Sequence, residues 1–288
     1  YVARIMLNRD KRLTPEIAQR AAENYLKEDP GARVPQIFTE YGLGNKSPIF
    51  VRDSIFEKNY VRNDKDLLFE ALNKGISLIG GIETIVKENS RVLIKPNLLS
   101  ARRPEEAVTT HPEFVRAVIR MLKERNCDIS VGDSPSGYGS NLVDNIYEVT
   151  GIKSVCSQEN VNLVKFDEAT VIDGIPIARH ALKQDAVISL PKFKTHGITV
   201  ITGAIKNMFG LVTGLTKVEF HKKFPSPDEF SRFIARFFSS VKPTLSIVDG
   251  ILAMDGEGPS GGRVRNLGLV VMGKDAVSVD SVLAGIAN

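Results

Sequence analysis

Three basic side chains occupy every second position of one short segment. Lys192, Lys194 and His196 are each separated by a single residue. In an extended chain alternate side chains point to the same face, so these three would form a basic surface that receives an anion. His196 would then be a catalytic acid or base, because imidazole titrates near neutral pH. The alternative is a solvated loop that is merely rich in charge.

A glycine-flanked segment with one lysine follows. Between Gly203 and Gly210 the chain carries Lys206 and Asn207. Glycine lets a backbone approach a ligand closely, and successive N–H groups can bind an oxyanion. Desolvation and neighbouring cations lower the pKa of a lysine, so we expect Lys206 to be a base or a covalent anchor. The alternative is a tight turn that starts a helix; the spacing is not that of a Walker A loop.

A predicted helix start provides a third candidate. Thr110 or His111 would be the N-cap, with Pro112 at the first helical position, and the positive end of a helix favours an anion. The alternative is an ordinary cap. With the residues that follow other strands, the predicted set for binding a substrate or cofactor comprises Lys95, Asn97, Thr110, His111, Lys192, Lys194, Gly203 and Asn207.

Four acidic side chains follow predicted strands. We expect Asp133, Asp249 and Asp255 to orient the lysines or hold a metal, with Asp133 taking part in catalysis. Asp249, Asp255 and Glu257 could share a divalent cation, since hard cations take carboxylate oxygens as ligands. The alternative is that these acids form turns with the glycines beside them.

Short runs rich in valine and isoleucine predict the strands that must position these residues. Runs this short, each ended by a polar or glycine-rich turn, are typical of strands buried on both faces. They span residues 49–51, 91–95, 128–132, 162–166, 186–190, 245–248 and 267–272. Helices are predicted at 64–78, 112–125, 141–150, 227–240 and 278–288. This alternation predicts an α/β fold with a mainly parallel sheet flanked by helices.

The candidate residues follow the strands at the place where parallel sheets bind ligands. In such sheets the ligand lies beyond the carboxyl ends of the strands. We therefore expect one α/β domain at 49–288 that carries the site. An N-terminal extension at 1–48 would precede it, with a helix of about fifteen residues from Thr14 to near Asp29.

The composition excludes several classes of protein. Cys127 and Cys156 are the two cysteines among 288 residues, which excludes a disulfide scaffold and a cysteine-ligated zinc or iron–sulfur site within this chain. There is no apolar run of about eighteen residues, so we expect no membrane span. The net charge of +4 and the 7% of aromatic residues do not indicate nucleic-acid binding. We expect a cytoplasmic location, although the chain starts at Tyr1 and a leader could have preceded it.

The motifs at the strand ends together resemble those of the DUF362 family, which is named for its unknown function. They are LIKPN, TTHP, VGDSP, LPKFKTH, TGAIKNMFG and IVDGI, and the resemblance covers residues 50–286. The resemblance implies a link to redox metabolism, because members often carry a ferredoxin-like module with iron–sulfur clusters. With two cysteines this chain departs from that layout, so redox chemistry here would need a ferredoxin-like partner or a missing segment.

A weaker resemblance is to nickel-dependent lactate racemases. In that family a glycine-rich segment presents a lysine that holds a nickel-pincer nucleotide, with histidines nearby. Here His196 precedes Gly203 and Lys206, and Gly210 and Gly214 follow. The arrangement is similar, but no motif matches.

The sequence therefore favours an enzyme that binds a small phosphorylated or carboxylated substrate or cofactor at the strand ends. Its cofactor is unknown, and a divalent metal would assist if the acids converge. The alternative is a non-catalytic accessory protein that docks a ferredoxin-like iron–sulfur partner or delivers a metal or cofactor. Docking through exposed charge should weaken steeply with ionic strength, whereas a buried site should respond less.

Overall fold

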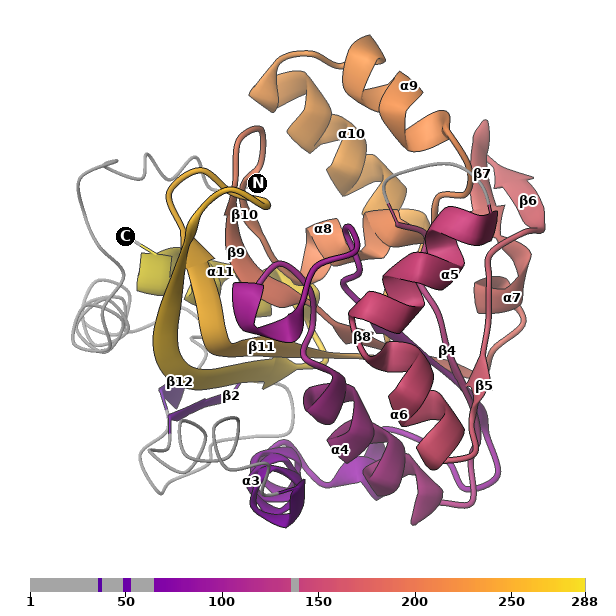
Figure 1. Cartoon of the computed structure of the whole chain (residues 1–288), viewed down its shortest axis with the longest axis vertical. Helices are drawn as coiled ribbons and strands as arrows, with labels where there is room; N and C mark the ends of the chain where they lie inside the picture. The colour runs from indigo at the N-terminus through magenta and orange to yellow at the C-terminus, as the bar shows by residue number, and fades with distance from the viewer. Residues whose placement is uncertain (1–35, 38–48, 53–64, 136–139, 288) are drawn as a thin grey trace.

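The computed structural model describes residues 36–37, 49–52, 65–135 and 140–287 (Figure 1). The helix predicted from Thr14 to near Asp29 lies outside these residues.

The runs rich in valine and isoleucine form the centre of one sheet. Within the described residues the strand order is β1-β2-β12-β11-β8-β3-β4-β5. β12 runs antiparallel to β11 and to β2, whereas β1 lies parallel to β2. The other strands on this path pair in parallel. Their bounds are β1 (Gln36–Ile37), β2 (Ile49–Arg52), β3 (Arg91–Pro96), β4 (Asp128–Val131), β5 (Asn162–Leu163), β8 (Ala186–Leu190), β11 (Leu245–Asp255) and β12 (Arg263–Gly273). The prediction of an α/β fold with a mainly parallel sheet is confirmed.

Helices cover both faces of the sheet and create two hydrophobic cores. Val92 and Ile94 of β3 lie in one core and Leu93 in the other, because side chains alternate along a strand. The first core includes α3 (Lys65–Leu78), α4 (Pro112–Lys123), α5 (Ser140–Val149) and α6 (Ile152–Gln158). The second includes α8 (Ala204–Met208), α10 (Pro227–Ser240) and α11 (Ala276–Ala287). Figure 1 shows α4 and α10 on opposite sides of β11.

Short elements fill the connections between these layers. β9 (Lys192–His196) and β10 (Val200–Thr202) form a hairpin beside β11, and α9 (Thr216–Lys223) precedes α10. A second hairpin is followed by α7, and the described residues also include three single turns of 3-10 helix. Their bounds are β6 (Ala169–Ile172), β7 (Ile175–Ala178), α7 (Arg179–Leu182), η1 (Ile82–Thr84), η2 (Pro104–Glu106) and η3 (Phe209–Leu211). Among the described residues, no helix has the length and hydropathy needed to cross a membrane.

Strand β11 is longer than the sequence predicts. The predicted strand end after Val248 is wrong, because β11 continues through Asp249 and Gly250 to Asp255. Asp249 is tolerated inside the strand because its carboxylate pairs with Lys192 of the neighbouring β9. Gly250 provides space, since a Cβ there would lie 2.4 Å from Leu269 Cδ1. The strand predicted at 162–166 is longer than the observed one, since β5 ends at Leu163.

Candidate functional site

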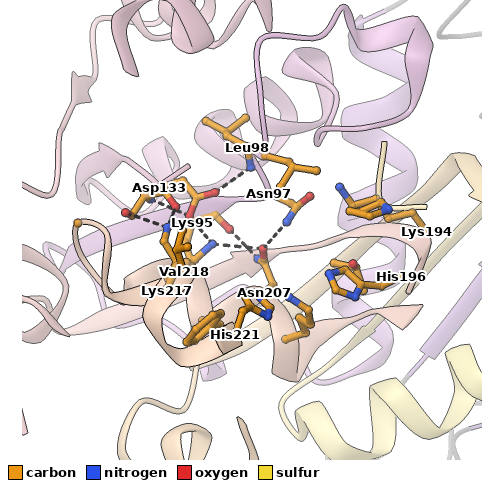
Figure 2. A pocket seen from close by; sticks show the side chains of 18 of the residues that line it. Lys95, Asn97, Leu98, Asp133, Lys194, His196, Asn207, Lys217, Val218 and His221 are labelled. Carbon is orange, nitrogen blue, oxygen red and sulfur yellow. Dashed lines mark hydrogen bonds and ion pairs between the residues drawn. The ribbon is translucent and has the colours of Figure 1, made fainter. Parts of the chain in front are cut away.

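A cavity of about 110 Å³ lies where β3 and β4 end, between β9, α8 and α9 (Figure 2). A buried water needs about 10–15 Å³ of such space, so the cavity can hold several waters or a small ligand. The charged side chains that line it are Lys95, Lys194, Lys206, Lys217 and Asp133. Four lysines facing one carboxylate form an environment that favours an anion.

Lys95 and Asp133 form a buried ion pair on one side of the cavity. Lys95 lies in β3 and Asp133 follows the neighbouring β4, and Nζ lies 2.7 Å from Oδ1. Burial lowers the pKa of Lys95, and the negative charge of Asp133 opposes this shift. The other carboxylate oxygen of Asp133 accepts a hydrogen bond from the Leu98 amide at 2.8 Å. Asp133 therefore holds the Lys95 ammonium in place at the end of β3.

Asn207 connects the strand ends through both ends of its side-chain amide. Its Oδ1 accepts hydrogen bonds from Lys95 Nζ (3.2 Å) and Asn97 Nδ2 (3.3 Å), while its Nδ2 donates to Ser189 Oγ (2.9 Å). Thr110 Oγ1 accepts from the Asn97 amide and so holds the backbone of that residue in place. Asn97 Oδ1 is buried and has no hydrogen-bond partner among the described residues. That oxygen is available to a donor on a ligand.

Gly210 has a packing role that the sequence did not indicate. A Cβ at this position would lie 2.2 Å from Asp133 Oδ1 and 2.5 Å from Lys95 Nζ. The missing side chain therefore makes room for the ion pair. The sequence predicts that the glycines of this segment approach a ligand, whereas Gly210 approaches the ion pair of Lys95 and Asp133.

Lys194 lies on the other side of Asn207 from Lys95, as Figure 2 shows. Its Nζ donates a hydrogen bond to the Val108 carbonyl at 2.6 Å. Burial, followed by the charges of Lys206 and Lys192, lowers the pKa of Lys194 to about 7. The ammonium therefore titrates near neutral pH, which makes Lys194 a proton donor or acceptor in the physiological range.

His196 also lines the cavity, but as a neutral imidazole. Its Nδ1 accepts hydrogen bonds from the amides of Ile198 (3.2 Å) and Thr199 (3.3 Å). Burial, together with the charges of Lys206 and Lys194, lowers the pKa of His196 to about 2. With Nδ1 acting as an acceptor, the ring proton lies on Nε2. This geometry favours a hydrogen-bond donor at His196 over the acid or base that the sequence predicts.

Helix α9 contributes two site residues that sequence reasoning missed. Lys217 donates from Nζ to the Ser134 hydroxyl (2.9 Å) and the Pro135 carbonyl (3.1 Å), and also contacts the Ser134 carbonyl. Burial lowers its pKa to about 8. His221 lies one turn later with a buried Nδ1 that has no partner among the described residues, and burial lowers its pKa to about 4. The spacing of four, which puts both on one face of a helix, is the signal that could have identified them.

Lys206 is the predicted lysine of the glycine-flanked segment, and the structure places it in the cavity. It lies in α8 and is partly buried. Its Nζ is 5.7 Å from the centre of the Phe209 ring and 5.8 Å from that of Phe230. Burial, followed by the charge of Lys95, lowers the pKa of Lys206 to about 8.

The N-terminus of α8 is held by Asp280 of α11. The Asp280 carboxylate accepts hydrogen bonds from the amides of Ala204 (2.5 Å) and Ile205 (3.0 Å). A Cβ at Gly203 would lie 2.2 Å from the same carboxylate, so the glycine makes room for this contact. Burial raises the pKa of Asp280 to about 7. Gly203 therefore helps to fix Lys206, whereas the sequence predicts that it contacts a ligand.

A second polar cluster lies apart from the cavity lining and contains three predicted residues. Lys192 Nζ lies 2.9 Å from Asp249 Oδ2, and the His111 amide donates to the same oxygen at 3.0 Å. His111 is the N-cap of α4, as predicted, and its Nδ1 accepts from the Glu113 amide. Burial lowers the pKa of Lys192 and of His111. The structure thus separates Lys192 from Lys194 and His196 by pairing it with β11.

The three acids predicted to share a metal are not brought together. Asp249 pairs with Lys192 in the middle of β11, whereas Asp255 is the last residue of that strand and pairs with Arg263 (3.2 Å) and Arg265 (2.8 Å). The backbone carbonyl of Glu257, an exposed residue, accepts a turn hydrogen bond. In the described part of the chain, no group of three or more histidines, cysteines or acids is arranged to hold a metal ion.

Comparison with known proteins finds one matching family model and a similar curated protein. Residues 92–285 match the family model described as "Domain of unknown function (DUF362)". A thylakoid-associated protein of Synechocystis sp. is 31% identical over 226 residues, which cover 76% of this chain and 70% of that protein.

Two solved structures are similar to this chain at low sequence identity. One is a Thermotoga maritima protein at 14% identity with a TM-score of 0.47, covering 77% of this chain and 58% of that one. The other is the lactate racemase apoprotein of Thermoanaerobacterium thermosaccharolyticum at 14% identity with a TM-score of 0.45, covering 72% of this chain and 50% of that one. This chain therefore spans less than two thirds of either structure, and the similarity concerns the fold alone.

Proposed function

We propose an enzymatic function for this chain, which belongs to the DUF362 family: it binds a small carboxylated or phosphorylated substrate in the lysine-lined cavity. The observation that carries this proposal is the charge of the lining. Lys95, Lys194, Lys206 and Lys217 face a single carboxylate, that of Asp133.

An anion would relieve the repulsion that these lysines impose on one another. Burial is the main cause that lowers the pKa of Lys194, Lys206 and Lys217. The charge of Lys206 lowers the pKa of Lys194 and Lys217 further, and the charge of Lys95 lowers that of Lys206. A lowered pKa means that the cavity disfavours the protonated form of the lysine. A bound anion favours the protonated forms and gains their combined attraction.

The asymmetry of the lining favours catalysis over simple binding. Lys95, Lys194 and Lys217 are each held by a hydrogen bond or an ion pair, whereas the described residues provide neither for Lys206. Lys194, Lys206 and Lys217 titrate within about one unit of neutral pH, which suits proton transfer. His196 adds a neutral hydrogen-bond donor. A divalent metal stays a prediction, and no role here depends on one.

The alternative of an accessory protein that docks a ferredoxin-like partner also stays a prediction. The lysines that define the site line a cavity, and Lys95 and Lys194 are buried. A docking surface for an acidic partner would need exposed charge. One relative is named as thylakoid-associated; for this chain a cytoplasmic location remains the prediction.

Thermal unfolding with sulfate tests the proposed anion site. Sulfate at tenfold its dissociation constant should stabilise the folded state by about 1.4 kcal/mol and raise the melting temperature. The gain should shrink in Lys217→Met and persist in Lys222→Met, which removes an exposed lysine of the same helix outside the cavity lining. An equal gain from chloride at matched ionic strength, or no loss in Lys217→Met, would contradict the proposal.

A further inference from the structure

We propose that Lys206 forms a covalent imine with the carbonyl group of a small aldehyde or ketone that also bears a carboxylate, such as a 2-oxo acid. This inference rests on the proposed anion site. It adds the reacting atom and the class of substrate.

The first observation is that Lys206 differs from the other lysines of the cavity. Lys95 is bound to Asp133, Lys194 to the Val108 carbonyl, and Lys217 to the loop that follows β4. For Lys206, the described residues provide neither a hydrogen bond nor an ion pair to Nζ. A nucleophilic amine needs a free lone pair, and this is the lysine whose amine is uncommitted.

The second observation is that Lys206 is nonetheless well positioned. Asp280 holds the first turn of α8, and the adjacent Asn207 is bonded to the ends of β3 and β8. The rings of Phe209 and Phe230 lie against the ammonium and limit its access to water. With a pKa of about 8, about a tenth of Lys206 is neutral at pH 7, compared with less than a thousandth for an ordinary lysine.

The third observation concerns the rest of the substrate. Lys95 and Lys217 offer fixed positive charge on the same cavity and can hold a carboxylate while the carbonyl faces Lys206. The orphaned Asn97 Oδ1 can accept a hydrogen bond from a hydroxyl group, including the one that forms when an amine adds to a carbonyl. Cations alone would bind any anion, whereas a free amine beside them selects one with a carbonyl group.

The proposed step balances without an oxidant or reductant. The lone pair of neutral Lys206 Nζ forms a bond to the carbonyl carbon, and the π electrons of the C=O bond move to oxygen. That oxygen takes a proton, for which the Lys194 ammonium of the same cavity is the nearest match in pKa to neutral pH. Nζ returns one proton to the neutral Lys194 amine, which leaves a neutral carbinolamine. The Lys194 ammonium then protonates the hydroxyl group, which departs as water while the Nζ lone pair forms the C=N bond. The product is a protonated imine, and water is the only species released.

Reductive trapping tests the imine directly. The full chain is incubated at pH 7.5 with millimolar glyoxylate or pyruvate and sodium cyanoborohydride, and intact mass spectrometry then counts the adducts. We expect one adduct per chain, which peptide mapping locates at Lys206. Acetaldehyde, which has no carboxylate, should label this lysine at least tenfold more slowly.

Lys206→Arg is the decisive variant, because arginine keeps the positive charge but cannot form an imine. It should lose the adduct while sulfate still raises its melting temperature, and Lys222→Met should be labelled like the unaltered chain. Labelling that persists in Lys206→Arg, or that spreads evenly over several lysines, would overturn the inference.

The two proposals fail in different ways. Sulfate stabilisation without any trapped adduct would leave the anion site standing and overturn the imine. Loss of both sulfate stabilisation and the adduct would overturn both. An adduct on Lys206 that forms equally fast with acetaldehyde would support a reactive lysine but overturn the carboxylated substrate.

Discussion

The Lys95 ammonium and the Asp133 carboxylate lie 2.7 Å apart, both buried, at the ends of neighbouring parallel strands. Removing one partner of a buried pair leaves the other charge unpaired. We therefore expect Asp133→Asn to lower the free energy of unfolding by about 3–5 kcal/mol.

The double variant Lys95→Met/Asp133→Asn serves as the control for that change. It leaves no unpaired charge, so it should be more stable than Asp133→Asn alone. Urea denaturation of the four proteins in this cycle measures the coupling. Additive losses would show that the two charges do not stabilise each other.

Gly210→Ala should disrupt the anion site without removing any of its charged groups. The new methyl group would overlap Asp133 and Lys95, so the pair must separate or the backbone must move. We expect lower stability and at least a tenfold loss of sulfate affinity, measured by thermal shift. Gly197→Ala is the matched control, because a Cβ at Gly197 meets nothing within 4 Å. Equal behaviour of the two variants would contradict this role of Gly210.

The lysine pKa values predict that the protein gains stability between pH 8 and 10. Lys194 titrates at about 7, and Lys206 and Lys217 at about 8, whereas all three keep their protons to about 10.5 when unfolded. In this interval the unfolded chain binds more protons, so the free energy of unfolding rises with pH. This gain in stability is lost again as the pH falls toward 7. The interval starts above the pKa of Asp280, so that carboxyl does not contribute. Burial raises the pKa of the Cys156 thiol to about 12, so this group opposes the gain above about pH 9, and the rise should be steepest between pH 8 and 9.

Sulfate protection should change in the opposite direction over the same interval. As the lysines lose their protons, the cavity loses its attraction for an anion, while sulfate keeps its own charge. Melting temperatures with and without sulfate at pH 8, 9 and 10 measure both effects. Lys206→Met should flatten the rise in stability. A melting temperature that falls steadily above pH 8, or sulfate protection that does not change, would refute the assignment.

The mouth of the cavity predicts a preference for ligands with an apolar part. Leu215 and Val218 line the cavity yet are 49% and 44% exposed, so a ligand could cover them. Burying about 40 Å² of apolar surface contributes about 1 kcal/mol, or fivefold in affinity. Hexanoate should therefore stabilise the chain at a lower concentration than acetate. Leu215→Ser should reduce this difference, whereas Leu182→Ser, at an exposed leucine away from this cavity, should not.

The central strands could be predicted from sequence, but the course of β11 could not. The valine and isoleucine runs of β3, β4 and β8 leave little choice of structure. Asp249 and Gly250 look like a turn because both residues favour turns. They remain in a strand because Lys192 neutralises the acid and Leu269 fills the space over the glycine. Both partners are distant in sequence.

Contacts between residues distant in sequence also decide which site residues the sequence could identify. Alternation correctly placed Lys194 and His196 together, because β9 is extended. It could not show that Asp249 draws Lys192 into another cluster, since that depends on the neighbouring strand. Lys217 was missed because its helix, α9, lies beyond the glycine-flanked segment at 203–210 and does not directly follow a predicted strand. Its role depends on contacts with the loop after β4.

The pairing of β2 with β12 places opposite ends of the described chain side by side. Ile49 lies opposite Met272, and Arg52 lies opposite Leu269. During synthesis β2 leaves the ribosome long before its antiparallel partner exists, so β2 stays unpaired on this side until residues 263–273 have emerged. A chain truncated before β12 would leave β11 and β2 with unpaired backbone groups, which invite aggregation. Versions of this protein shortened before β12 are therefore poor reagents.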